Sequence, residues 1–193
     1  MKKIYFVTGN AGKVLSLQNR LPKDIQIEQV KIELPEIQHH DIEEIVRQKA
    51  KFAYEQLKKP LIVQDSAFHI EALNNFPGPY IKYINETIGA EGILKLMKGE
   101  KNRTAYFKLA LAYTDDKGKI TVFTNAINKG GKISNYLSSS NSTKAWSGIW
   151  RIYIPYWAKK TLSELTDEEI DNHEKGKQDK SEFAEFAKWI GQK

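Results

Sequence analysis

The N-terminal part of the chain shows strand-like and helix-like hydrophobic patterns in turn. Residues 3–8 form an apolar run typical of a buried strand, and residues 10–20 suit a short helix that ends before Pro22. From residue 25 to residue 32 apolar positions alternate with polar ones, which predicts a second strand. The pattern therefore predicts a strand, a helix and a strand in succession.

The clearest predicted helix runs from residue 41 to residue 57. Its apolar positions recur with a period of about 3.6 residues and form one stripe along the helix. Asp41 is the expected N-cap, and Glu44 stands where a capping box needs its acidic residue. Leu61-Ile62-Val63 is then interpreted as a buried strand that ends at the polar pair Gln64-Asp65.

The remaining predicted elements of the chain are shorter. Residues 134–147 are polar, small and low in complexity, which predicts a mobile surface loop. Because the chain shows neither an internal repeat nor a second domain, residues 1–193 are interpreted as a single domain. The other expected elements are a loop at 74–80, a helix at 86–97, strands at 105–113 and 119–124 joined by a hairpin turn at 115–118, a strand at 149–155 and a helix at 183–190.

Composition narrows the classes of molecule that this protein is expected to bind. The net charge of +6 favours polyanionic partners such as nucleotides. The lysines are spread along the chain, however, without the basic block of a nucleic-acid-binding arm. The absence of cysteine excludes disulfides, thiolate catalysis and Cys-based zinc sites. Since the chain has neither a signal-peptide core nor an apolar run of about 20 residues, a soluble, cytoplasmic protein without membrane contact is expected.

A candidate phosphate site follows the first predicted strand. Phe6-Val7 leads directly into Thr8-Gly9-Asn10-Ala11-Gly12-Lys13, which places hydroxyl, amide and ammonium groups beyond the carboxyl end of a strand. The amides of a following helix can also bind an anion. The spacing is not that of a Walker A loop. The alternative is a plain strand–turn–helix corner with no ligand.

Three side chains are candidates for metal binding and catalysis. Asp65, after an apolar strand, can hold a metal or activate water, or can simply cap a turn. Glu36 can supply a second oxygen ligand for Mg²⁺, or can be an exposed loop residue. Lys49 borders the buried face of its helix, where it either reaches into a cleft or extends to solvent. The pair His39-His40 is interpreted as exposed rather than metal-binding.

Aromatic residues gather after the Ser-rich stretch. A nucleobase could stack on one of them, although packing in the core is the commoner role of such residues. They are Trp146, Trp150, Tyr153, Tyr156 and Trp157.

Taken together, five segments resemble motifs of the inosine triphosphate pyrophosphatase family, which hydrolyses non-standard purine nucleotides. They follow one another in the family order over nearly the whole chain. The segments are Thr8–Lys13 (family T-G-N-x-x-K), Leu34–Gln38 (L-P-E-[IY]-Q), Val63–Ser66 (V-E-D-[ST]), Ala72–Lys82 (A-L-x-G-x-P-G-x-Y) and Lys160–Glu169 (K-T-x-A-E-M-x-x-E-E).

The resemblance implies an α/β fold, with an elongated single domain, a central mixed β-sheet, two lobes flanking a cleft, and usually a homodimer. It also implies Mg²⁺-dependent hydrolysis of a nucleoside triphosphate to the monophosphate and pyrophosphate. By motif position, the substrate would be bound by Thr8, Gly9, Asn10, Lys13, Ser66 and Lys82, the metal by Glu36 and Asp65, and catalysis would use Asp65 and Lys49.

Departures from the family pattern lie mostly in the base-binding segments. Gln64 replaces an acidic residue beside Asp65, and Trp150 stands where the family has the aspartate that holds the purine. Ile170 replaces a lysine, and Lys175 can stand in for an arginine, without its planar two-pronged contact. Trp150 and Lys175 are therefore expected to contact the substrate in a changed way.

The sequence is compatible with three candidate functions. The first is an active pyrophosphatase acting on ITP, dITP or XTP, with an altered base preference. The second is a weakened family member that binds nucleotide without efficient turnover. The third, a nucleic-acid-binding module, lacks a basic stripe or recognition motif. The intact phosphate segments favour the first.

Overall fold

The computed structural model describes residues 1–140, 142, 145, 147–175 and 181–192, with the backbone alone at 126–129, 171, 174 and 175. The chain divides into two compact units. The first comprises Met1–Ser66, Leu109–Asn125 and Lys180–Lys193, and the second comprises Ala67–Lys108 and Ala126–Asp179.

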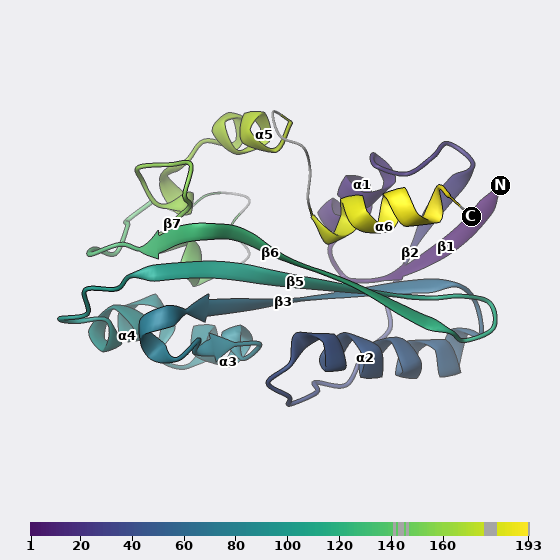
Figure 1. Cartoon of the computed structure of the whole chain (residues 1–193), viewed down its shortest axis with the longest axis horizontal. Helices are drawn as coiled ribbons and strands as arrows, with labels where there is room; N and C mark the ends of the chain where they lie inside the picture. Colours follow the sequence, from purple (N-terminus) through teal and green to yellow (C-terminus); the bar gives the residue numbers. More distant parts are fainter. Residues whose placement is uncertain (141, 143–144, 146, 176–180, 193) are drawn as a thin grey trace. The chain divides into compact units, whose positions relative to one another are not determined.

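Parallel strands form the centre of the first unit. Strand β1 (Lys2–Val7) pairs with β2 (Ile25–Val30) and with the start of β3 (Leu61–Ile70). Helices α1 (Ala11–Gln18) and α6 (Glu182–Ile190) lie on one side of these strands and α2 (Ile42–Leu57) on the other (Figure 1). Cover on both faces explains why β1 and the start of β3 are nearly continuous apolar runs.

The helices α1 and α2 begin at side-chain caps. Asn10 accepts hydrogen bonds from the backbone at the start of α1, and Asp41 accepts one from the backbone N–H of Glu43 (3.0 Å), as predicted. The capping box does not form, because the backbone N–H of Asp41 donates to His39 Nδ1 (3.1 Å). Glu44 instead accepts a hydrogen bond from Gln48 (2.8 Å).

The predicted hairpin joins β5 (Thr104–Thr114) to β6 (Ile120–Ile133). In its turn, Asp115 Oδ1 accepts hydrogen bonds from the backbone N–H groups of Lys117 and Lys119, both at 2.9 Å. Gly118 adopts φ +80°, a conformation that favours glycine. Both strands are longer than the apolar pattern predicted, and β3, β5 and β6 each begin in one unit and end in the other.

The sheet has the strand order β2-β1-β3-β5-β6-β7. A two-residue strand β4 (Pro77–Gly78) pairs antiparallel with β3, and β7 (Tyr153–Ile154) pairs antiparallel with β6. Parallel and antiparallel pairs thus occur together, and the expectation of an α/β fold with a central mixed sheet is confirmed. The second unit also holds η1 (Glu71–Leu73), α3 (Ile81–Glu86), α4 (Gly89–Leu96), η2 (Gly148–Arg151), η3 (Leu162–Glu164) and α5 (Asp167–Lys175).

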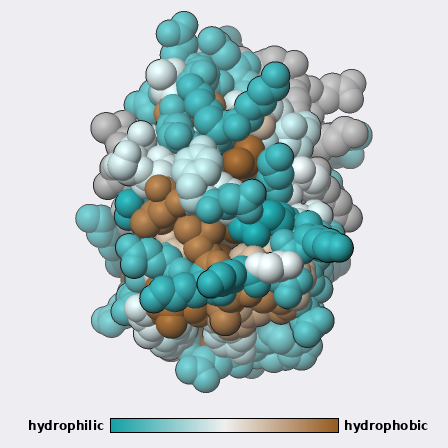
Figure 2. Space-filling model, turned by 90° about the vertical axis from the view of Figure 1, so that its left-hand side faces the viewer, coloured by the Kyte–Doolittle hydropathy of each residue, from teal (hydrophilic) through white to brown (hydrophobic). Residues whose placement is uncertain are grey.

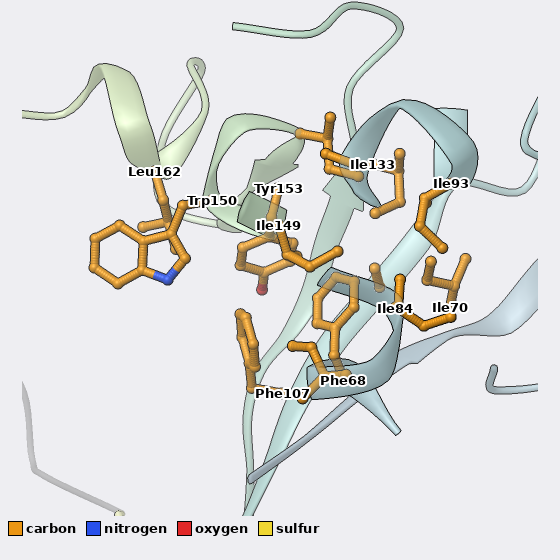
Figure 3. Packing of buried hydrophobic residues seen from close by; sticks show 14 of the residues in the cluster. Phe68, Ile70, Ile84, Ile93, Phe107, Ile133, Ile149, Trp150, Tyr153 and Leu162 are labelled. Atoms are coloured by element: carbon orange, nitrogen blue, oxygen red, sulfur yellow. The ribbon is translucent and has the colours of Figure 1, made fainter. Parts of the chain in front are cut away.

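Each unit has a hydrophobic core of its own. In the first unit Phe6 of β1 meets Phe183 of α6 edge to face, with ring centroids 6.0 Å apart. In the second unit the rings of Phe68, Phe107 and Tyr153 pack against one another, as Figure 3 shows, with centroids 4.7–5.4 Å apart. Aromatic pairs at these separations contribute about 0.5–1.5 kcal/mol each beyond the area they bury.

The strand that carries Asp65 does not end where the sequence suggested. Gln64, Asp65 and Ser66 lie in the middle of β3, which continues through the buried residues Ala67 and Phe68. The polar run resembled a strand end because it interrupts the apolar pattern. In the structure the side chains of Gln64 and Asp65 have polar partners in Glu182 and Lys49, and the strand continues.

Two other expectations are corrected. The helix expected at 86–97 begins later, as α4 at Gly89 with φ +61°, and the preceding residues form a separate helix, α3, that ends at Glu86. The segment 149–155, expected as a strand, begins with the 3₁₀ turn η2, where Ser147 accepts a hydrogen bond from the backbone N–H of Ile149 (3.2 Å). Within the loop expected at 74–80, only Pro77–Gly78 has strand pairing.

Two further findings concern the sequence predictions. Among the described residues, no helix is both long and apolar enough to cross a membrane. The Ser-rich stretch 134–147 carries no helix or strand in its described part, and its mobility remains a prediction.

Candidate functional site

The turn after β1 is built by its own polar side chains. The Asn10 side-chain oxygen accepts hydrogen bonds from the backbone N–H groups of Gly12 (2.9 Å) and Lys13 (3.3 Å). Thr8 Oγ1 accepts one from the backbone N–H of Asn10 (3.1 Å). A Cβ built on Gly9 would meet nothing within 4 Å, so open space lies beside the backbone there. The predicted phosphate segment is therefore a preformed turn at a helix N-terminus with room for a ligand.

Lys13 is the charged residue of this turn. Desolvation by partial burial lowers the pKa of Lys13, while the negative charges of Asp65 and Glu182 oppose that shift. The positive charge of Lys49 lowers the pKa further. These four residues therefore belong to one electrostatic neighbourhood within the first unit, as the predicted phosphate site requires for Lys13, Lys49 and Asp65.

Asp65 is held by two partners. Lys49 Nζ of α2 lies 2.6 Å from Asp65 Oδ2, and the backbone N–H of Ser66 donates to Asp65 Oδ1 (2.8 Å). The side chains of Lys49 and Asp65 are only 15% and 28% exposed. Of the two roles considered for Lys49, the structure thus shows the inward one, in which its ammonium group pairs with the carboxylate.

Glu182 belongs to this neighbourhood and was missed by the sequence analysis. It is 1% exposed, and its Oε1 accepts a hydrogen bond from Gln64 Nε2 (2.5 Å). A signal was present in the sequence, since Glu182 precedes the buried Phe186 and Ile190 by one and two helical turns. That spacing puts a carboxylate on the apolar face of α6.

Glu36 lies in a segment without helix or strand and is exposed. No group of three or more His, Asp or Glu residues that could hold a metal ion occurs within the part of the chain that the structure describes. His39 stacks on His40 with centroids 4.4 Å apart and accepts from the backbone at the start of α2. His39 is half-buried rather than exposed, and its ring nitrogen accepts a hydrogen bond from the backbone N–H of Asp41, the N-cap of α2.

The remaining predicted site residues lie in the second unit. Lys82 is exposed near the start of α3. Trp150 packs in the core and is 9% exposed, and its Nε1 is buried without a hydrogen-bond partner among the described residues. In Figure 3 its ring lies beside Leu162. Lys175 is the last residue of α5, and its side chain lies outside the described atoms.

A pocket of about 560 Å³ lies between α5 and the segment before η3, within the second unit. Trp157 and His173 stack in it, with centroids 3.8 Å apart and ring planes 16° apart. Desolvation lowers the pKa of His173, which favours the neutral imidazole. Lys160 and Glu169 on its wall form an ion pair at 2.9 Å. Such a pocket offers a planar aromatic surface bordered by polar groups.

Comparison with known proteins gives one consistent result. Residues 4–185 match the family model described as the Ham1 family. The dITP/XTP pyrophosphatase of Methanopyrus kandleri is 39% identical over 168 residues, 86% of either chain. That of Thermococcus kodakarensis is 36% identical over 190 residues, 97% of either chain.

Solved structures agree on the fold. The HAM1 protein of Coxiella burnetii gives a TM-score of 0.77 over the full length of both chains at 18% identity. A nucleoside-triphosphatase / dITP/XTP pyrophosphatase of Mycobacterium abscessus gives 0.72 at 22% identity, over 90% of this chain and 94% of the other. At these identities the likeness concerns the fold alone.

Proposed function

This chain belongs to the Ham1 family, and from that premise we propose that it is a hydrolase that converts non-standard purine nucleoside triphosphates to monophosphates and pyrophosphate. Its curated relatives are named dITP/XTP pyrophosphatases, so dITP, XTP and ITP are the proposed substrates. The observation that carries the proposal is the Lys49–Asp65 pair, which shares an electrostatic neighbourhood with Lys13 of the turn after β1.

Binding of the triphosphate is assigned to the turn after β1. The exposed backbone at Gly9, the N-terminus of α1 and the ammonium group of Lys13 together offer donors and positive charge to phosphate oxygens. Thr8 and Asn10 keep the turn in shape through the hydrogen bonds described above. Their proposed contact with substrate would add to this role, since a hydroxyl can donate as well as accept.

Glu36 and Asp65 would hold Mg²⁺, and their carboxylates fit its chemistry. This ion uses one or two protein carboxylates and fills its other positions with phosphate oxygens and water. When bound, it would neutralise charge that develops on the phosphates. Glu36 is exposed and Asp65 is 28% exposed, so both can offer carboxylate oxygens to an ion that arrives with a triphosphate.

Asp65 and Lys49 are assigned the catalytic roles. Asp65 orients a water molecule toward the α-phosphorus and takes its proton, while the bond to the bridging oxygen breaks and pyrophosphate leaves. Lys49 Nζ fixes the carboxylate at 2.6 Å and adds positive charge near the phosphates. Ser66 fixes the other carboxylate oxygen through its backbone N–H.

Recognition of the base is assigned to the second unit. Trp150, which its motif position assigns to the substrate, packs in the core, with its indole N–H buried and without an acceptor among the described residues. Lys82 and Lys175 would add positive charge toward the substrate, as their motif positions imply. No observation on the described residues favours the weakened-enzyme alternative; Ile170, one of the departures that suggested it, is a core residue at 7% exposure.

A homodimer and a cytoplasmic location remain proposals, as do the single domain and the two lobes around a cleft. Figure 2 shows hydrophobic residues gathered among hydrophilic ones on one face, and patches of this kind mark protein interfaces. A mass by light scattering twice the 22.2 kDa of the chain is expected. Exposed large hydrophobic residues of the second unit are Phe76, Tyr83, Ile88, Leu96, Tyr136 and Tyr156.

The test is product analysis with Mg²⁺ and the triphosphates ITP, XTP, dITP, GTP, ATP, dUTP and dTTP. Monophosphate and pyrophosphate from ITP, XTP and dITP, lost on chelation of the metal, are expected. Turnover of another base in their place would overturn the proposed substrate class. The absence of product from all of them would overturn the proposed activity.

A further inference from the structure

The contact between Gln64 and Glu182 joins residues that are far apart in the sequence. Gln64 follows the buried Val63 and precedes Asp65 on β3, while Glu182 is the first residue of α6. Gln64 Nε2 donates to Glu182 Oε1 at 2.5 Å. Gln64 Oε1 is buried and has no hydrogen-bond partner among the described residues. The amide is therefore oriented by the carboxylate of α6.

The position of Glu182 is fixed by its helix. Ser181 is the N-cap of α6 and accepts a hydrogen bond from the backbone N–H of Ala184 (3.3 Å). Phe183 and Phe186 anchor the helix in the core of the first unit. A carboxylate in the first helical turn is also stabilised by the helix dipole. Glu182 thus stays at 1% exposure as a rigidly placed charge.

That charge acts on the proposed phosphate site. Burial lowers the pKa of Lys13 in the turn after β1, and the negative charges of Asp65 and Glu182 oppose this shift. A neutral amide at position 64 provides no charge of its own. The negative charge that contacts Gln64 therefore comes from α6.

We propose that Glu182 is a positioning residue whose carboxylate, held by α6, fixes the Gln64 amide and adds negative charge to the surroundings of Lys13, and so keeps both in place for catalysis at Asp65. This inference rests on the proposed pyrophosphatase function. Removing the charge by Glu182→Gln leaves Lys13 with Asp65 as its remaining negative neighbour. Adding a charge by Gln64→Glu places two carboxylates in contact, where they repel each other.

A charge exchange between the two positions tests the proposal. We expect Glu182→Gln and Gln64→Glu each to lower kcat/KM by about tenfold or more, as for lost hydrogen bonds to charged groups. The double variant carries both substitutions, so the carboxylate lies on β3 and the amide lies on α6. The pair again consists of one carboxylate and one amide. Its kcat/KM should return to within about threefold of the unmodified chain, because the effects of contacting residues are not additive.

Two further measurements separate positioning from a purely structural role. Glu185→Gln removes an exposed carboxylate from the same helix and should leave kcat/KM unchanged. Thermal unfolding of every variant gives the folded fraction, and kcat is corrected for it. Loss of activity in fully folded Glu182→Gln, restored in the double variant, supports the proposal.

The inference is overturned if folded Glu182→Gln keeps full activity, if Gln64→Glu alone is as active as the unmodified chain, or if the double variant is no better than the single ones. Failure of the proposed function is a different result. In that case the unmodified chain itself releases no pyrophosphate from any triphosphate, and the inference falls with it.

Discussion

The two units place their candidate functional groups in contrasting surroundings. In the first unit, Asp65 is fixed by Lys49 and by the neighbouring backbone, and Gln64 is fixed by Glu182. In the second unit, Trp150 lies among apolar side chains, and its indole N–H has no acceptor among the described residues. Charge is thus balanced locally in one unit, whereas the other holds an aromatic ring in its core whose N–H donor has no acceptor among the described residues.

This difference predicts which substitutions affect turnover and which affect the choice of base. Removing one member of a set of paired charges is strongly destabilising, because its partner is then left buried and unpaired. An aromatic surface accepts many planar groups, and its selectivity depends on a few polar atoms. Substitutions in the first unit should therefore affect turnover, and substitutions in the second should affect the choice of base.

The largest expected effect is that of Asp65→Asn. It removes the proposed proton acceptor and metal ligand and leaves Lys49 without its partner at 2.6 Å. We expect kcat to fall by at least about a hundredfold, the scale of general-base catalysis. Release of pyrophosphate from ITP measures the effect, and Asp24→Asn, at an exposed position, is the matched control. Unchanged turnover would refute the role of Asp65.

Lys13→Met comes next. It keeps the aliphatic stem but removes the ammonium group that the turn after β1 presents. KM for the triphosphate should rise by about tenfold, as for the loss of a charged hydrogen bond, while kcat changes less. Steady-state kinetics separate the two, and Lys23→Met at an exposed position is the control. An equal effect of both variants would mean that only net charge matters.

Trp150→Phe tests the second unit. The ring is kept and the buried N–H is lost, so the ratio of kcat/KM for ITP to that for ATP should fall by up to about tenfold. Turnover of the preferred substrate should change less than in Asp65→Asn. Trp189→Phe in the first unit should leave the ratio as it is. A preserved ratio in Trp150→Phe would remove Trp150 from base recognition.

The smallest effect concerns His173. Burial against Trp157 lowers its pKa, so the folded state binds a proton there less readily than the unfolded chain does. The contribution of this residue to stability is therefore present above its ordinary pKa and decreases as the pH falls below it. An NMR titration should place the imidazole pKa below about 6.5, the ordinary value. In Trp157→Leu it should rise toward that value, and an unmoved pKa would contradict the role of burial.

Local rules predicted most of the elements of the first unit. Asp41 caps α2 as expected, and Asp115 shapes the hairpin turn, because both depend on hydrogen bonds to backbone groups a few residues away. The same holds for the turn at Asn10. Gly89, by contrast, delays the helix that was expected to begin at residue 86, because the backbone there adopts φ +61°.

Within the site, the sequence named the members of the Lys49–Asp65 pair without showing that they meet. Residues of α2 and β3 come together only because the helix packs on the sheet. Glu182 lay outside the predicted set, since its partner Gln64 is far away in the sequence and its charge seemed out of place on an apolar helix face. Such a charge is stable only when a distant partner desolvates with it.

The sequence by itself determined the family, the apolar strands and the cap of α2, and it named Thr8, Lys13, Glu36 and Asp65 as candidate site residues, because these depend on short motifs and local periodicity. Tertiary structure alone decided that β3 continues through its polar run, that Lys49 turns inward, and that Glu182 supplies a carboxylate beside Gln64. The physical reason is that buried charges are stabilised by partners brought together by packing, and packing joins segments that local rules treat separately.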